Sequence, residues 1–305
     1  MSTVVEDTLR RLFPLDSAIE EEWRRRLANA PENAAALAAR LAGIGRGPAH
    51  PKRPALAVFT AGHGIAKKRP LAAPPLPQAG DLPLYIVDME QRDHLVDVPP
   101  PARLLRRPAG SASNDISRGP AMSIATARQA VETGIALAGE WREHDVLAIA
   151  CSSAGGLYAA SAMAARCLGE YQAADLPEGI EAALLAEILA VACEGKSGLQ
   201  FLAAFGGLDI GAAAGLMLAL ATEHRPIVLL GFAAAAAALV AARLEPFIRD
   251  YLFAAGIECP LHRATLAWLG APLLAPDNAP SDSIVGEAMA VLAAASALFI
   301  EAGRA

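Results

Sequence analysis

The chain has 305 residues, 54% of them hydrophobic, with a formal net charge of −6 and a pI near 5.6. This length and apolar content fit one large globular domain, or a domain with an appendage, and provide enough material for a substantial core. The charges are interspersed rather than gathered on a basic face, so we expect no nucleic-acid partner.

The sequence predicts neither export nor a membrane span. The chain reaches Glu6 and Asp7 at once, without the basic start and apolar centre of an export signal. Two long uncharged stretches, residues 146–165 and 226–242, contain glycine and are largely alanine, so a buried strand followed by a buried helix explains each better. The widely spaced cysteines are expected to be reduced thiols. We therefore predict a cytoplasmic protein with no membrane partner.

Residues 4–41 are predicted to form a pair of amphipathic helices. Ile19, Trp23 and Leu27 recur every four residues with charged residues between them, as on the apolar face of a helix. Pro31 interrupts this pattern, so we expect it to separate the two helices.

From about residue 50 onward, short apolar runs alternate with helical segments. The runs typical of buried strands are residues 55–60, 84–88, 146–150 and 227–230. The segments typical of helices are residues 124–143, 199–221 and 232–243, with a further alanine-rich helix near the C-terminus. This alternation predicts an α/β fold in which helices cover both faces of a mostly parallel sheet.

Polar residues stand just after the predicted strands. His63 lies between two glycines after the first strand, Asp88 ends the second, and Cys151 and Ser152 follow the third. A strand, a glycine-bearing turn and a helix is the order that α/β folds use beside ligands, so a binding site is expected at this edge of the sheet. A turn histidine bonded to backbone, a capping carboxylate and a turn of small residues are the alternative explanations.

A set of motifs follows in order along the chain: Gly62-His63-Gly64-Ile65, Val87-Asp88, Asp115-Ile116, residues 119–123, residues 206–210, residues 226–232 and Tyr251-Leu252. With these motifs, the sequence resembles the nicotinate-nucleotide:dimethylbenzimidazole phosphoribosyltransferase family over most of residues 50–300. The resemblance implies a Rossmann-like α/β domain over residues 50–250 and a small helical domain that begins with residues 1–45. Residues 251–305 are expected to complete the site and the small domain.

The resemblance also implies an activity and two small-molecule partners. Members of that family move a phosphoribosyl group from nicotinate mononucleotide to a benzimidazole-like aromatic base, which gives the lower-ligand nucleotide of a cobamide. The expected assembly is a homodimer or a dimer with a paralogue, and no cofactor is expected. Displacement at C1 of the ribose needs donors for the 5-phosphate, a slot for the flat base and a carboxylate that takes the base's N–H proton.

The chain diverges from the family at positions where the family pattern has a carboxylate. Gly62 replaces an Asp, Cys151 replaces a Glu, and Leu230 replaces a second Asp. The glycine-rich turn that cradles phosphate in the family has no counterpart in residues 169–195. These replacements predict a pocket that has lost much of its polar lining.

The family's proposed general base, a Glu near the C-terminus, aligns with Ser281. The neighbouring Asp282 is the candidate catalytic residue, with one methylene less of reach. General-base catalysis contributes about 100- to 10,000-fold, so its loss would slow a positioned reaction rather than abolish it.

The other candidate site residues are expected to contact substrate because they match or adjoin family motifs: His63, Asp88, Ser113, Met122, Ser123, Cys151, Ser152, Gly206, Gly207 and Asp209. Helix capping is the alternative role for the serine at 123 and for the aspartates. No His and Asp partner set is identifiable for a cysteine nucleophile at 151. Cys259 and His262 have no second ligand pair, so we predict no metal site.

Two classes of function fit the sequence. The first is a transferase of cobamide lower-ligand metabolism whose choice of base or donor is altered by its changed side chains. The second is a catalytically degenerate paralogue that binds a nucleotide or base, or that pairs with an active homologous subunit. A small-molecule-binding protein that uses the same cleft is a third alternative. At the level of sequence, enzyme and non-enzyme both stay open.

Overall fold

Six parallel strands form one sheet in the order β3-β2-β1-β4-β5-β6. The computed structural model describes residues 3–67, 69, 71–90, 98, 102–190, 197–275 and 284–302. The strands within them are β1 (Pro54–Thr60), β2 (Leu84–Glu90), β3 (Arg103–Gly110), β4 (Val146–Cys151), β5 (Ile227–Leu230) and β6 (Leu252–Ala254). The order reverses between β1 and β4, and doubly wound sheets bind ligands outside the carboxyl ends at such a point.

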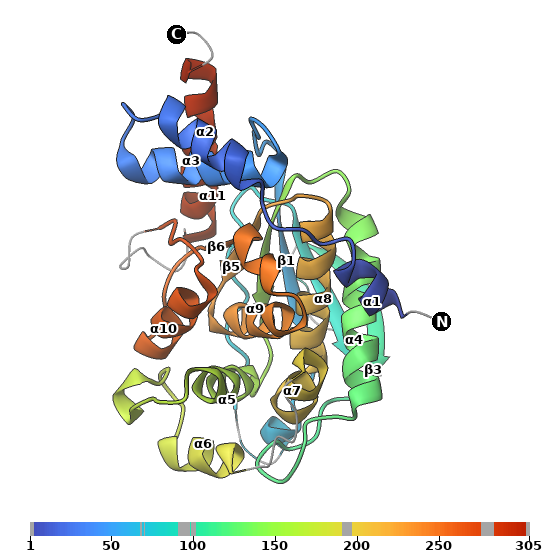
Figure 1. Cartoon of the computed structure of the whole chain (residues 1–305). Coiled ribbons are helices and arrows are strands. Elements are labelled where there is room, and N and C mark those ends of the chain that lie inside the picture. The colour runs from blue at the N-terminus through green and yellow to red at the C-terminus, as the bar shows by residue number, and fades with distance from the viewer. Residues whose placement is uncertain are drawn as a thin grey trace.

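Helices precede β1, separate the strands from β3 to β6 in sequence and follow β6, as the alternating sequence pattern predicted for that part of the chain. They are α1 (Val4–Leu9), α2 (Ser17–Arg26), α3 (Glu32–Gly45), α4 (Ile124–Leu137), α5 (Gly156–Leu168), α6 (Ala182–Leu189), α7 (Gly198–Phe205), α8 (Leu208–Thr222), α9 (Phe232–Leu244), α10 (Pro260–Leu269) and α11 (Ile284–Ala302). Short 3-10 turns occupy Gly64–Lys67, Ala138–Trp141, Ala173–Asp175 and Pro246–Tyr251. The α4, α8 and α9 helices pack side by side along the sheet (Figure 1). The predicted α/β fold with a parallel sheet is confirmed.

Glycines let α4 and α8 approach until their backbones touch. A Cβ atom at Gly134 would collide with the carbonyl oxygen of Ala212, and one at Gly215 would collide with that of Val131. The next helix in this layer, α9, is built mainly from buried alanines. Small side chains therefore set the thickness of the helical layer over the sheet.

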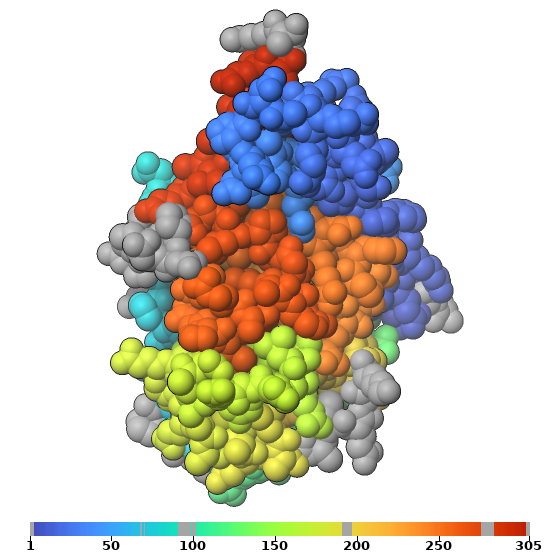
Figure 2. Space-filling model, turned by 60° about the vertical axis from the view of Figure 1, so that its left-hand side comes forward, coloured from blue at the N-terminus to red at the C-terminus, as the bar shows by residue number. Residues whose placement is uncertain are grey.

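The N-terminal helices divide between two parts of the molecule. The α2 and α3 helices pack together, and α11 packs against α3, with the rings of Trp23 and Phe299 in edge contact at 4.8 Å between centroids (Figures 1 and 2). The α1 helix packs instead on α4 and α8, where Arg128 donates to the Thr3 hydroxyl at 3.1 Å. The predicted single pair over residues 4–41 is therefore corrected to α2 and α3 with a separate α1. The domain boundaries stay a prediction.

By length and composition, α11 could cross a membrane, with a mean hydropathy of 1.8. One side of it is buried, however, and this side includes Val285, Leu292 and Phe299. A core helix that packs on its own protein passes the same test, so the composition of α11 does not assign the chain to a membrane.

Two strands escaped the sequence analysis, and each has a physical reason. The β3 strand contains Arg103, Arg106 and Arg107 and lies at the edge of the sheet, where it needs no continuous apolar run. Pro108 is tolerated there because an edge strand can do without one backbone donor. The β6 strand at the opposite edge has only three residues, too few to show a pattern.

The close approach of α4 and α8 predicts that Gly215→Ala lowers the free energy of unfolding by about 1–3 kcal/mol, because the methyl group must push two backbones apart. Chemical denaturation measures the change. Gly139→Ala is the matched control, since open space surrounds that position, and it should stay within about 0.5 kcal/mol of the parent chain. Equal stability of the two variants would contradict the described packing.

Candidate active site

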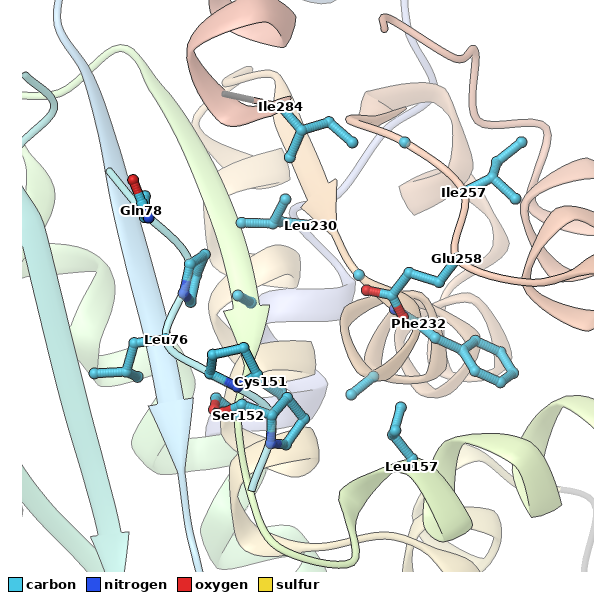
Figure 3. A pocket seen from close by; sticks show the side chains of 17 residues that line it. Leu76, Gln78, Cys151, Ser152, Leu157, Leu230, Phe232, Ile257, Glu258 and Ile284 are labelled. Atoms are coloured by element: carbon cyan, nitrogen blue, oxygen red, sulfur yellow. Dashed lines mark hydrogen bonds between the residues drawn. The ribbon is translucent and has the colours of Figure 1, made fainter. Parts of the chain in front are cut away.

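A cavity of about 440 Å³ opens at the carboxyl ends of β4 and β5 (Figure 3). Its walls come from five segments of the chain that are far apart in sequence. The lining residues are Pro74, Pro75, Leu76, Pro77, Gln78, Ala150, Cys151, Ser152, Leu157, Leu230, Gly231, Phe232, Ala233, Gly256, Ile257, Glu258 and Ile284. The cavity thus lies at the edge of the sheet where the sequence predicted a site.

The wall of the cavity is mainly apolar. Leu230 lies at the end of β5 and Leu157 on α5, and Ile257 and Ile284 lie toward α11 and the β6 side (Figure 3). Only four of the lining residues that the structure describes have polar side chains, namely Gln78, Cys151, Ser152 and Glu258. Such a space favours a mainly apolar ligand that carries a few polar atoms.

Two predicted site residues, Cys151 and Ser152, line this cavity at the end of β4. The Ser152 hydroxyl donates to the carbonyl oxygen of Pro74 at 2.7 Å and so fastens the proline-rich segment over the strand end. Burial, together with the negative charge of Asp209, raises the pKa of the Cys151 thiol well above its ordinary value. The thiol therefore stays protonated at neutral pH, which argues against a cysteine nucleophile.

Beside the cavity, three buried side chains form a hydrogen-bonded network. His63 Nε2 lies 3.0 Å from Asp209 Oδ1, and the Ser153 hydroxyl donates to Asp209 Oδ2 at 2.6 Å. The Ser153 oxygen in turn accepts the N–H of Ala61 at 3.0 Å. The network joins the residues after β1, the residues after β4 and the first turn of α8.

The carboxyl group of Asp209 is ionised although it is fully buried. Burial alone would raise its pKa, but His63, the Ser153 hydroxyl and the N–H of Ile210 outweigh burial, and the pKa is lowered. An ionised carboxylate accepts only, so the facing His63 Nε2 carries a hydrogen. Gly207 is required here because a Cβ atom would collide with both the His63 ring and the Asp209 carboxylate.

Several predicted substrate-binding residues lie outside the cavity wall. Ser123 caps α4 by accepting the N–H of Thr126, which is the alternative role that the sequence offered. Met122 donates its N–H to Ala203 near the end of α7, and Gly206 caps that helix. The roles of these residues in substrate binding stay predictions.

Asp88 and Ser113 are buried near the Gly62-His63-Gly64 motif that follows β1. The N–H of Ser113 donates to the carbonyl oxygen of Gly62 at 3.0 Å, and Asp88 Oδ1 accepts the N–H of Glu90 at 3.3 Å. Glu90 Oε2 lies 2.6 Å from the position that a Gly62 Cβ atom would occupy. A carboxylate from β2 therefore fills the space beside Gly62, where the family pattern has an Asp.

Two polar residues of the cavity wall, Gln78 and Glu258, were not predicted from the sequence, and the charged one is Glu258. Glu258 follows β6 by four positions and stands two residues before Pro260, the first residue of α10. Because β6 was not predicted, nothing in the sequence placed Glu258 at the carboxyl edge of the sheet. Its carboxylate points into the cavity from the wall opposite Cys151 (Figure 3).

Two other sequence expectations concern residues near the C-terminus. Asp282 lies outside the described residues, so its catalytic role stays a prediction. Cys259 caps α10, since its sulfur accepts the N–H of His262 at 3.3 Å. The buried His262 accepts the N–H of Glu258 through Nδ1 at 3.2 Å. These two residues thus hold the start of α10.

Comparisons with known proteins agree on one family. The sequence pattern of a family described as phosphoribosyltransferase matches residues 72–277. Nicotinate-nucleotide–dimethylbenzimidazole phosphoribosyltransferases from Roseiflexus sp. and Desulfotalea psychrophila are 32% and 30% identical to this chain. The first alignment covers 83% of this chain and 82% of the relative, and the second covers 82% and 81%.

A solved structure has the same overall arrangement. The crystal structure of the phosphoribosyltransferase of that name from Thermus thermophilus superposes with a TM-score of 0.79 and 29% identity. The superposition covers 95% of this chain and 99% of the other.

The buried network predicts a large effect of Asp209→Asn on folding. The amide cannot hold His63 Nε2 and the Ser153 hydroxyl as a carboxylate does, so the free energy of unfolding should fall by about 3 kcal/mol or more. Asp16→Asn is the same chemical change at the N-cap of α2, where Asn caps as well as Asp, and should change stability by less than about 0.5 kcal/mol. A similar loss in both variants would mean that the buried network contributes no more to the free energy of unfolding than an exposed helix cap does.

Burial lowers the pKa of His262 to about 4, which predicts that His262 makes the protein less stable in acid. Between that value and the ordinary value near 6.5, the unfolded chain binds a proton that the folded chain does not, so stability falls as the pH falls through this window. The full difference amounts to about 3 kcal/mol. His262→Gln should flatten the pH dependence of unfolding measured by chemical denaturation.

Comparing the pH dependence of unfolding of the parent chain with that of His262→Gln separates the contribution of His262 from that of the neighbouring Glu258. The pKa of Glu258 is raised, chiefly by burial, so that group acts in the opposite sense, with stability falling as the pH rises. Glu258 is present in both proteins, and its contribution largely cancels in the difference. Parallel pH curves for the parent and the variant would exclude His262 as the acid-sensitive group.

Proposed function

The chain belongs to the nicotinate-nucleotide–dimethylbenzimidazole phosphoribosyltransferase family, and we propose that it moves a phosphoribosyl group from nicotinate mononucleotide to a benzimidazole-like aromatic base. The relatives bear this activity in their names. The observation that supports it for this chain is the apolar cavity at the carboxyl ends of β4 and β5, with a carboxylate on its wall. A fused aromatic ring needs such a slot.

The chemistry is a displacement at C1 of the ribose. A ring nitrogen of the base attacks this carbon, the bond to the nicotinate nitrogen breaks, and its electron pair neutralises the pyridinium ring. The base is left positively charged and must lose its N–H proton. Holding the two rings in line converts a bimolecular step into an almost unimolecular one, which accounts for much of the acceleration in such reactions.

The cavity wall suggests how each ring is held. Leu157, Leu230, Ile257 and Ile284 provide apolar surface against which a base can stack. The described residues of the wall include no lysine or arginine, so a phosphate here would depend on N–H and hydroxyl donors, or on residues beyond the described ones. The proposal keeps Asp282 as a candidate catalytic residue. It also keeps the expected assembly, a dimer of like chains or with a paralogue.

Purified protein incubated with nicotinate mononucleotide and 5,6-dimethylbenzimidazole should release nicotinate and form a new nucleotide in equal amounts. Chromatography separates and measures both. Ile257→Trp should raise the KM for the base roughly tenfold by narrowing the slot, since a misfitting ring costs a pocket of this kind about 1–3 kcal/mol. Ile19→Trp, a partly buried site on α2 far from the cavity wall, is the control.

Other outcomes would point away from this proposal. Release of no nicotinate with any of several aromatic bases would contradict it for the chain alone. Activity that arises only after mixing with a complete paralogue from the same cell would identify a partner subunit instead. Sedimentation of the two chains, separately and together, distinguishes a homodimer from such a mixed dimer.

A further inference from the structure

Glu258 is the one charged side chain among the described residues that line the cavity. Its carboxylate projects from the segment after β6 toward the end of β5, and Cys151 lies on the other side of the space (Figure 3). A ligand in this cavity would therefore meet apolar surface on most sides and a carboxylate at one point. Glu258 is therefore the carboxylate, among the described lining residues, that can accept a proton from a ligand.

Both carboxylate oxygens of Glu258 have defined positions. Oε2 accepts the N–H of Phe232 at 3.1 Å, at the first residue of α9. Oε1 lies 2.8 Å from the place that a Cβ atom would take at Gly231, whose φ of 82° also favours glycine. Because one oxygen is held by a backbone donor, the carboxylate is oriented before any ligand arrives.

The backbone of Glu258 is fixed as well. Its N–H donates to His262 Nδ1 at 3.2 Å, and the His262 ring stacks on the Phe232 ring at 5.3 Å between centroids. The same phenylalanine thus contacts the carboxylate through its N–H and the supporting histidine through its ring. Two hydrogen bonds thus tie Glu258 to the first turns of α9 and α10.

We propose that Glu258 accepts the N–H proton of the entering base during phosphoribosyl transfer. This inference rests on the proposed function and names the residue that completes its chemistry. The base nitrogen bonds to C1 of the ribose as the bond from C1 to nicotinate breaks. The proton on the other ring nitrogen passes to the Glu258 carboxylate, which later returns it to water. The products are nicotinate, the new nucleotide and one proton.

The surroundings of Glu258 suit this role. The residue is exposed along the cavity, but neighbouring protein atoms withdraw its carboxyl from bulk water and raise its pKa, and the Phe232 N–H opposes this only in part. A raised pKa makes the carboxylate a better base. Around it, the pKa values of Cys151 and Cys259 are raised and that of His262 is about 4, so none of these three titrates between about pH 5 and pH 8.

A purely structural role, as a cap of α9, gives a different expectation. Glu258→Gln keeps an oxygen that can accept the Phe232 N–H but cannot take up a proton. If capping were the whole role, this variant would keep both its stability and its turnover. Glu245→Gln is the matched control, because Glu245 accepts the N–H of Phe247 in the same way at a site outside the cavity.

The test compares the full-length protein with these variants, using nicotinate mononucleotide and 5,6-dimethylbenzimidazole between about pH 5 and pH 9. We expect Glu258→Gln to lower kcat by about 100- to 10,000-fold, with the KM for the mononucleotide and the Tm nearly unchanged. The parent's rate should fall in acid as Glu258 is protonated, and this limb should disappear in the variant. Glu245→Gln should match the parent.

A second variant keeps the proposal testable if Glu258→Gln folds poorly. Glu258→Ala leaves space for a small carboxylate that can take up the proton, so added formate should restore part of its turnover. Full turnover in Glu258→Gln would overturn the proposal while leaving the proposed function intact. The same follows if Asp282→Asn, and not Glu258→Gln, removes the acid limb. A parent chain inactive with every base would overturn both.

Discussion

The ionised carboxylate of Asp209 is buried at the centre of the sheet's carboxyl edge, and such a charge is costly unless every neighbour is arranged to satisfy it. His63, the Ser153 hydroxyl and the N–H of Ile210 meet that demand from the turn after β1, the turn after β4 and the start of α8. Since the carboxylate has all these partners only when the two turns and the helix start lie together, the network fixes how the ends of β1 and β4 lie relative to one another. Cys151 and Ser152, which line the cavity, immediately precede Ser153, so the network also fixes the position of this part of the cavity wall.

Missing side chains in this protein are as informative as present ones. A position-by-position reading of the sequence finds a carboxylate lost at Gly62 and another at Leu230. In space, Glu90 Oε2 fills the volume beside Gly62, and the Glu258 carboxylate sits against Gly231, one residue after Leu230. The first carboxylate comes from the end of β2 and the second from the segment after β6. Two of the three positions where the family pattern has a carboxylate thus have another carboxylate nearby in space, which the order of residues along the chain conceals.

The sequence predicted what depends on local pattern. The β1, β2, β4 and β5 strands are continuous apolar runs because both of their faces are buried, and this alone revealed the parallel sheet. His63 and Asp209 were each singled out from motifs, but their contact spans 146 residues and needed the fold. Glu258 could not be placed at all, since the strand that positions it has three residues and no pattern of its own.

An apolar cavity with one carboxylate suits a reaction in which positive charge moves from one ring to another. In nicotinate mononucleotide the charge lies on the departing pyridinium, and after attack it lies on the entering base. A fixed carboxylate nearer the base stabilises the second state more than the first, and low-polarity walls strengthen that preference. Among the described residues of these walls, the uncharged side chains that could hydrogen-bond a ring substituent are those of Gln78, Cys151 and Ser152. On the proposed mechanism, the choice of base therefore depends on whether attack leaves a proton within reach of Glu258, and on whether the ring fits the slot.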